Sequence, residues 1–246
     1  MRRQLPVFYI NSPERQDLRN LMEEQFNTLQ IVAERFQAID TAAIHYTLRD
    51  KYYVSSKWPQ RSPEQIAVGL SHLALWQLMA ERRLTGAVIF ADTVTISPRL
   101  PQFLDRLGGD LPDRIAVLRL DTTGDQVKLG RHNQRTIGPV LAQRLLSTHS
   151  GIGGYVISAE FSRQIAGHRR LHDADLETFL FGRAGPLLHV SGVYQAVPAL
   201  GLATAPQAPR PAVPPLASRL LHTARDLVYF GREALTPARA IPFAGP

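Results

Sequence analysis

The sequence predicts a single α/β domain with a mostly parallel sheet, followed by a basic helical tail. Short apolar runs suited to buried strands alternate with segments whose apolar residues recur at helical spacing. Two of these runs lead into Asp92 and Asp121, at the strand ends where an open α/β sheet places its ligand crevice. With 246 residues, 44% of them hydrophobic, the chain is long enough to bury one full core.

The first third of the chain predicts two strands and two helices. A strand at 5–10 is followed by a helix over 15–28, which Ser12 is expected to cap because Pro13 follows it directly. A second apolar run, at 31–39, precedes a helix that begins at Ser62. Each helix therefore follows a strand, as in a layered α/β domain.

The rest of the domain predicts a further set of short elements. A glycine-rich turn at 151–154 enters a strand, and Gly192 marks a turn between two others. The expected strands lie at 87–90, 115–120, 155–158, 187–190 and 193–196, and a helix is expected over 173–181.

The composition changes after residue 203. Residues 1–203 carry the α/β pattern, residues 204–215 form a proline-rich linker, and residues 216–246 form a basic amphipathic tail. Such a tail can lie in the headgroup layer of an anionic membrane surface, or it can dock on the domain's own surface. Both interpretations stay open.

Composition also excludes several kinds of site and partner. The chain has no cysteine, so any metal must be held by oxygen or imidazole ligands. A net charge of +7 indicates an anionic partner, but the basic residues are dispersed and no nucleic-acid-binding signature occurs, so nucleic acid is not expected. No run approaches the roughly 20 apolar residues of a membrane span, and the N-terminal run is too short for a signal peptide, so we expect a cytoplasmic protein.

Several segments in a fixed order resemble one known family. They read VFYINSPERQDLR, EQIAVGLSHLALW, VIFADTVTIS, GIGGYVIS and HDADLETFLF. In order and spacing they are similar to the motifs of glycosyltransferase family 25, which includes lipooligosaccharide galactosyltransferases and the glycosyltransferase domains of collagen-modifying enzymes. The resemblance extends over residues 6–202.

The resemblance implies a fold, a reaction and partners. The fold would be a nucleotide-sugar-binding domain of the GT-A type. The reaction would be inverting transfer of a hexose, galactose from a UDP-sugar donor, to a saccharide or lipid-linked glycan such as a lipooligosaccharide core. A lipid-linked acceptor would place the protein on the inner face of the inner membrane.

The family's metal site is altered in this chain. The family holds a divalent cation such as Mn²⁺ with an E-D-D motif, which eases departure of the pyrophosphate. Here the three positions are Ala91, Asp92 and Thr93, so only Asp92 can supply a charged ligand and Thr93 offers a hydroxyl. We therefore expect weak metal binding. The alternatives are a non-catalytic scaffold protein, and a metal-independent transferase in which Arg15, Arg119 or Arg131 neutralises the pyrophosphate.

The resemblance also implies roles for individual residues. Asp175 would be the base that deprotonates the acceptor hydroxyl, with His72 as a second catalytic residue. Each role has an ordinary alternative: Asp175 on a solvated acidic face, His72 as a core histidine, and Arg119 with Asp121 as a structural ion pair. The implied substrate-binding residues are Asn11, Arg15, Ser71, Arg119, Asp121, Gly154 and Tyr155.

Overall fold

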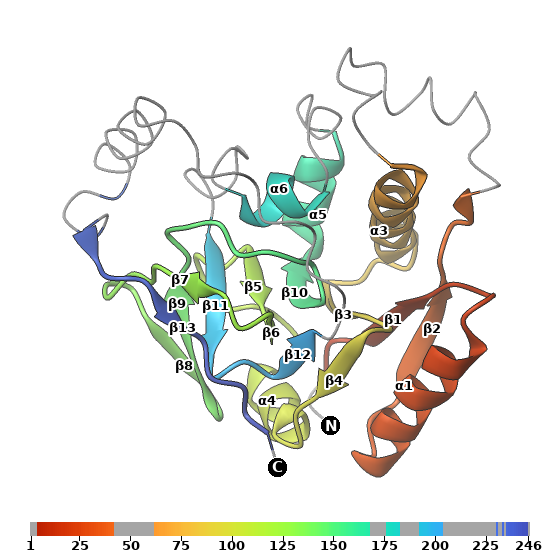
Figure 1. Cartoon of the computed structure of the whole chain (residues 1–246), viewed down its shortest axis with the longest axis horizontal. Helices are drawn as coiled ribbons and strands as arrows, with labels where there is room; N and C mark the ends of the chain where they lie inside the picture. Colours follow the sequence, from red (N-terminus) through yellow and green to blue (C-terminus); the bar gives the residue numbers. More distant parts are fainter. Residues whose placement is uncertain are drawn as a thin grey trace.

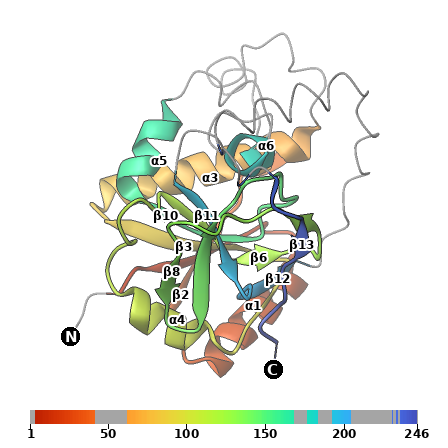
Figure 2. The same cartoon turned by 90° about the vertical axis from the view of Figure 1, so that its left-hand side faces the viewer.

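The computed structural model describes a layered α/β domain. The structure describes residues 4–41, 62–167, 176–182, 192–203, 230, 233 and 235–245. A sheet of eight strands forms its centre, and helices cover both faces (Figure 1). Figure 2 shows α3, α5 and α6 on one face and α1 and α4 on the other.

The strands of the large sheet follow the order β2-β1-β3-β10-β5-β11-β9-β8. Three neighbouring pairs are parallel (β1 with β2, β1 with β3, and β5 with β11), and the other four are antiparallel. Taken along the sheet, these pairings point six strands one way and only β9 and β10 the other way. The bounds are β1 Val7–Asn11, β2 Ala33–Gln37, β3 Gly86–Ala91, β5 Val117–Arg119, β8 Arg135–Ile137, β9 Val140–Arg144, β10 Gly154–Ser158 and β11 Val193–Val197.

The prediction of a mostly parallel sheet holds for strand direction, because six of the eight strands point the same way. It does not hold for strand pairing, because four of the seven neighbouring pairs are antiparallel. β10 lies between β3 and β5 and runs antiparallel to both. Its residues are buried and apolar like those of its neighbours, because helices cover both faces of the sheet. An apolar run of this kind carries no information on strand direction.

Two smaller sheets extend the domain. The first pairs β4 (Val94–Ile96), β12 (Gly201–Ala203) and β6 (Asp121–Thr122), so it begins just beyond the ends of β3 and β5. The second pairs β7 (Gln126–Val127) with β13 (Arg239–Ala240). Strand β12 lies between β4, which follows Asp92, and β6, which begins with Asp121. It therefore joins the chain segments at the two strand-end aspartates.

Helix α3 (Pro63–Glu81) begins where the sequence predicts. Ser62 accepts a hydrogen bond from the backbone N–H of Gln65, and the Gln65 side chain accepts one from the backbone of Ser62, which completes a capping box. Pro63 at the first helical position fits because its missing N–H would have no intrahelical partner. The expected helix start at residue 62 is confirmed.

Helix α1 begins differently from the prediction. It spans Gln16–Thr28, and Arg15 holds the N-cap position without a side-chain cap. Ser12 was expected to cap this helix, and that expectation was wrong. Residues 12–15 form a turn instead, in which the carbonyl of Ser12 accepts from the backbone N–H of Arg15. The turn lies directly beyond β1 and carries Arg15 toward the strand ends.

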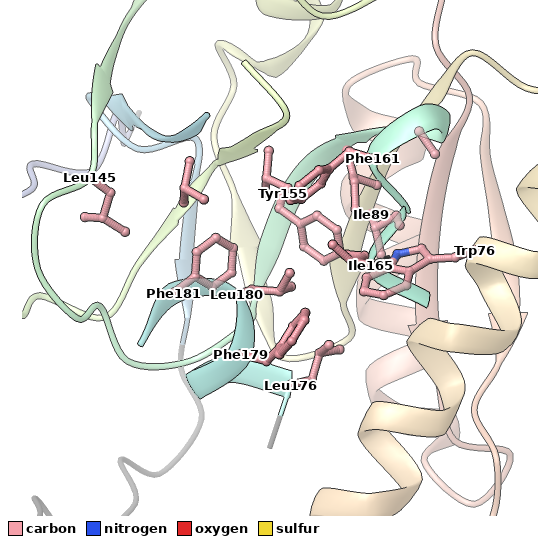
Figure 3. Close-up of a cluster of buried hydrophobic side chains, with 14 of the residues drawn as sticks. Trp76, Ile89, Leu145, Tyr155, Phe161, Ile165, Leu176, Phe179, Leu180 and Phe181 are labelled. Carbon is pink, nitrogen blue, oxygen red and sulfur yellow. Dashed lines mark hydrogen bonds between the residues drawn. The ribbon is translucent and has the colours of Figure 1, made fainter. Parts of the chain in front are cut away.

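The other helices are shorter. They are α4 (Leu100–Leu107), α5 (Ala159–Ala166) and α6 (Leu176–Phe181). The helix expected over 173–181 is described only from 176, and the strand expected at 187–190 lies outside the described residues. α6 contributes three consecutive aromatic or aliphatic side chains, Phe179, Leu180 and Phe181, to the buried cluster drawn in Figure 3.

The end of the chain packs on the domain. Phe230 is buried in the cluster that includes Phe181, with the Arg144 guanidinium 5.0 Å from its ring centre. β13 pairs with β7, and Ile241 and Ala244 are buried. Residues 235–245 therefore belong to the folded domain rather than to a separate tail, while residues 204–229 lie outside the described part.

Candidate functional site

The first group of candidate residues lies at the carboxyl ends of β1 and β3. These strands are parallel neighbours, so Asn11 at the end of β1 comes beside Asp92, which follows β3. The Asn11 Nδ2 atom donates to Asp92 Oδ2 at 2.9 Å and to the backbone oxygen of Arg15 at 3.0 Å. Arg35 from β2 donates through Nε to Asn11 Oδ1 at 2.9 Å. Both N–H groups of the Asn11 amide therefore donate, and its oxygen accepts one hydrogen bond.

Arg15 completes this group from the solvent side. Its NH1 atom lies 3.9 Å from Asp92 Oδ1, and its side chain is 50% exposed while that of Asp92 is 10% exposed. We call Asn11, Arg15, Arg35 and Asp92 the strand-end network. It contains two guanidinium groups and one carboxylate, and the Arg15 end of it faces water.

This strand end fits a divalent cation poorly. Asp92 already accepts a hydrogen bond from Asn11 on Oδ2, and its Oδ1 faces a guanidinium. Ala91 offers no ligand atom in its side chain, and Thr93 offers a neutral hydroxyl. Hard cations are held by several oxygen ligands, with carboxylates supplying the negative charge. The described residues here supply one carboxylate with a guanidinium beside it, which is fewer charged ligands than a hard cation requires.

The second group is a buried ion pair on β5 and β6. Arg119 and Asp121 are two residues apart and share a face, as their alternation predicts. The Arg119 NH2 atom donates to Asp121 Oδ2 at 2.9 Å, and neither side chain is exposed. Arg119 NH1 also donates to the backbone oxygen of His149 at 2.8 Å, and the guanidinium lies 4.8 Å from the ring centre of Phe181. The arrangement agrees with the structural ion pair that the sequence left open.

The ion pair fixes the loop before β10. Arg119 donates to the backbone oxygen of Ser150, and Asp121 Oδ2 accepts from the backbone N–H of Gly153 at 3.2 Å. The Gly153 oxygen in turn accepts from the backbone N–H of Ala91 at 2.8 Å. A chain of hydrogen bonds therefore runs from the ion pair to the residue that precedes Asp92.

His149 and Gln195 belong to this group and were missed in the sequence. Gln195 Nε2 donates to two backbone oxygens, so its Oε1 is the acceptor for His149 Nδ1 at 2.9 Å. The proton is then on Nδ1, and burial, followed by the nearby Arg119 charge, holds the pKa of His149 well below its usual value. Their spacing of 46 residues gives no signal in a single sequence.

Among the described residues, two buried acceptors of this group have no hydrogen-bond partner. They are Asp121 Oδ1 and His149 Nε2. Unpaired buried acceptors are costly, and an ordered water is the usual solution. Both atoms are enclosed, and the described contacts of this group hold the loop before β10. A substrate-binding role for Arg119 and Asp121 stays a prediction.

The third group is built around Tyr155 on β10. Trp76 Nε1 donates to the Tyr155 hydroxyl at 3.1 Å, so the hydroxyl proton is directed to His72 Nδ1 at 2.7 Å. Burial lowers the pKa of His72 to about 3 and raises the pKa of Tyr155. A neutral His72 that contacts Tyr155 agrees with the core histidine that the sequence left open. A catalytic role for His72 stays a prediction.

Ser71 and Gly154 have local structural tasks. Ser71 Oγ donates to the Ala67 backbone oxygen at 2.7 Å and accepts from the backbone N–H of Ile39 at 2.9 Å, which ties α3 to the residues after β2. A Cβ on Gly154 would lie 2.7 Å from the Phe90 ring. Glycine is needed there because β10 approaches β3 closely. A substrate-binding role for either residue stays a prediction.

Asp175 and Arg131 are the remaining residues that the sequence analysis named. Asp175 lies outside the described residues. Arg131 is exposed on a turn whose backbone N–H donates to Glu233 Oε1 at 2.7 Å. The residue that the sequence missed in the network is Arg35, which lies 24 positions from Asn11 on β2 and has the polar neighbours Glu34 and Gln37 on the same strand.

Comparison with protein families decides the assignment. The model for glycosyltransferase family 25 (LPS biosynthesis protein) matches residues 4–170, about two thirds of the chain. The chain belongs to glycosyltransferase family 25. No curated protein matches the chain.

Family 25 membership makes the chain a glycosyltransferase of LPS biosynthesis, with a nucleotide-sugar donor and a glycan acceptor as its partners. The matched range contains the whole strand-end network, the ion pair and Tyr155, and it ends before Asp175 and Gln195. In the described part of the chain, no helix is both long enough and apolar enough to cross a bilayer.

Proposed function

We propose that this family 25 protein transfers a hexose, galactose from UDP-galactose, to a lipooligosaccharide or another surface-polysaccharide acceptor. The strand-end network carries the proposal. It sits at the carboxyl ends of parallel strands, where α/β sheets bind nucleotides, and it offers cations to a pyrophosphate.

The proposed reaction is a single displacement. The acceptor hydroxyl oxygen forms a bond to the anomeric carbon of the donor sugar, and the bond from that carbon to the phosphate oxygen breaks. The bonding electron pair leaves with UDP, and the hydroxyl proton goes to a carboxylate base, for which Asp175 is our candidate. One displacement inverts the anomeric centre, so the product would be the β-linked galactoside.

The described residues would bind and orient the donor. We place the pyrophosphate beside Arg15, which is the exposed member of the network, and the ribose beside Asp92. Arg119 and Asp121 would hold the loop at 149–153 against the end of β3, and Tyr155 would be held by His72 and Trp76. A divalent cation such as Mn²⁺ would bind weakly and improve donor binding only slightly.

A membrane location is a further part of the proposal. Residues 216–229 carry several apolar side chains together with Arg219 and Arg225, which favours an anionic lipid surface. Ending the chain at Ala203 would also remove buried Ile241 and Ala244, so substitution is the better test. Arg219→Gln with Arg225→Gln should reduce co-sedimentation with anionic vesicles. Unchanged sedimentation at low salt would contradict the membrane role.

A second candidate function is a non-catalytic, glycan- or nucleotide-binding scaffold. The observation that favours it is the loss of two acids from the strand end, at Ala91 and Thr93. The scaffold would bind UDP or a glycan without releasing UDP from UDP-galactose. The two candidates therefore differ in turnover and not in binding.

Calorimetry followed by a turnover assay tests the proposal. The wild-type chain is titrated with UDP, UDP-galactose and UDP-glucose, with and without Mn²⁺, and then incubated with UDP-galactose and a lipooligosaccharide acceptor. We expect UDP to bind and Asn11→Ala to weaken that binding, while Arg163→Gln, an exposed substitution on α5, has no effect. Binding without UDP release would favour the scaffold, and absence of binding at millimolar UDP would refute the nucleotide site.

A further inference from the structure

Two guanidinium groups lie beside the polar residues at the ends of β1 and β3. Arg35 donates a hydrogen bond through Nε to Asn11 Oδ1 at 2.9 Å. The other two nitrogens of its guanidinium have no hydrogen-bond partner among the described residues. Arg15 approaches from the turn before α1, with NH1 3.9 Å from Asp92 Oδ1. Asn11 touches both, because its amide oxygen accepts from Arg35 and its amide nitrogen donates to the Arg15 backbone and to Asp92.

Nearby carboxylates offset only part of this charge, since Glu23 lies within electrostatic range of Arg35. Glu23 is the neighbouring acid on α1, but its Oε1 accepts from Arg19 Nε at 2.8 Å and from the Tyr9 hydroxyl at 2.9 Å. Asp92 is the only carboxylate in the network and is held on Oδ2 by Asn11. Within the strand-end network itself, two guanidinium groups therefore accompany one carboxylate, where the family's acidic motif would supply negative charge.

We infer that Arg15 and Arg35 neutralise the donor's pyrophosphate in this chain, and that Asp92 positions Arg15 instead of binding a metal. This inference rests on the proposed function, since it concerns the same donor site. A guanidinium presents paired N–H donors that match two phosphate oxygens, which makes arginine suited to hold a diphosphate leaving group. The negative charge that develops on UDP as the sugar–phosphate bond breaks would then be stabilised by two fixed cations.

Other arginines do not fit this role as well. The Arg119 guanidinium is buried and bound to Asp121 and to two backbone oxygens, so it is not accessible to a ligand from the strand-end side. Arg131 lies on a turn whose backbone N–H donates to Glu233, and it makes no described contact with Asn11 or Asp92. Arg15 and Arg35 alone among these are joined through Asn11 to the end of β3.

The test compares ligands with and without phosphate. UDP and uridine are titrated into the wild-type chain and into Arg15→Gln, Arg35→Gln and the double variant, in EDTA and in Mn²⁺. We expect each single substitution to weaken UDP about tenfold, with uridine changed less than twofold. EDTA should change the wild-type affinity for UDP less than tenfold. Arg163→Gln removes one exposed positive charge away from the site and serves as the matched control.

A second measurement separates a charge contact from a folding effect. Wild-type UDP affinity should fall as salt rises, and the double variant should show a shallower dependence because two phosphate contacts are missing. Thermal melting of each variant confirms that the chain remains folded.

The outcomes separate this inference from the proposed function. UDP binding that EDTA abolishes and that survives both arginine substitutions would overturn the inference, while the donor site itself would stand. Equal losses of UDP and uridine affinity would also overturn it, because the arginines would then act on the nucleoside or on the fold. Absence of UDP binding in the wild-type chain under every condition would refute the proposed function and the inference together.

Discussion

Asn11 and Asp92, 81 residues apart, are joined by a 2.9 Å hydrogen bond that ties the end of β1 to the end of β3. The same Asn11 amide accepts from Arg35, so one short side chain links three strands. Because Asn11 is 1% exposed, water cannot replace these bonds readily. The donor site proposed for this family 25 protein depends on this amide.

We expect Asn11→Ala to destabilise the fold and to weaken UDP binding. Asp92 and Arg35 would each lose a partner in a mostly buried setting, at a cost of about 1–3 kcal/mol. Urea unfolding and UDP calorimetry measure the two effects. Asn20→Ala on the exposed face of α1 removes only a surface contact with Gln16 and should have almost no effect. Equal behaviour of the two variants would contradict the role of Asn11.

We expect the Arg119–Asp121 pair to be a stability element. Asp121→Asn would leave the buried guanidinium without its counter-charge, at a cost of about 3–5 kcal/mol in urea unfolding. Replacing both residues, as in Arg119→Met with Asp121→Leu, should cost less than the sum of the two single changes. Arg82→Gln breaks the exposed pair with Glu34 and should cost less than about 1 kcal/mol. If Asp121→Asn also cost less than about 1 kcal/mol, the Arg119–Asp121 pair would not be a stability element.

Stability should fall as the pH falls from 7 to 5. Burial lowers the pKa of His72 from 6.5 to about 3, so in this range the unfolded chain binds a proton that the folded chain does not. The stabilising contribution is fully present above pH 6.5 and decreases below it, by about 2 kcal/mol between pH 7 and pH 5. His149, whose pKa is also lowered by burial and by Arg119, acts in the same direction.

Substitution of His72 isolates its share of this pH dependence. His72→Gln keeps an acceptor for the Tyr155 hydroxyl but does not titrate, so the loss of stability between pH 7 and pH 5 should become smaller. Tyr155→Phe keeps the buried histidine and should retain the steep dependence. Urea unfolding at several pH values makes the comparison, and an unchanged slope in His72→Gln would show that His72 is not buried neutral.

Restoring the acids at the end of β3 should create metal dependence. In the wild-type chain we expect Mn²⁺ to improve nucleotide binding less than tenfold, or about 1.4 kcal/mol. Ala91→Glu with Thr93→Asp would surround Asp92 with carboxylates and should increase the effect of Mn²⁺ in calorimetry. Thr95→Asp adds a charge on the exposed side of β4 and is the control. If the effect of Mn²⁺ on nucleotide binding did not increase in the double variant, the metal site would not lie at the end of β3.

The end of the chain should contribute to folding stability. Phe230→Ala removes a buried ring that packs against Arg144, at a cost of about 3 kcal/mol. Leu235→Ala alters a side chain that is 69% exposed and should change stability by less than about 0.5 kcal/mol. Thermal melting distinguishes them. Equal melting temperatures would indicate that the segment around Phe230 does not pack on the domain.

The sequence by itself determined the strands β1, β3 and β11, the helix α3 with its capped start, and the family. These features are local: a cap, an apolar run and a motif are each set by residues close together in the chain. Alternation along one strand was also enough to place Arg119 and Asp121 on a common face. The presence of Asp92 at a strand end follows in the same way.

Only the tertiary structure decided which of these residues meet. Arg35 reaches Asn11 because β2 pairs in parallel with β1, and His149 reaches Gln195 because its loop is held beside β11, and neither pairing leaves a periodic trace. β10 enters antiparallel between β3 and β5 with a buried apolar run that looks the same in either direction. Burial likewise made His72 neutral and the Arg119–Asp121 pair internal, since desolvation depends on what packs around a side chain and not on its neighbours in sequence.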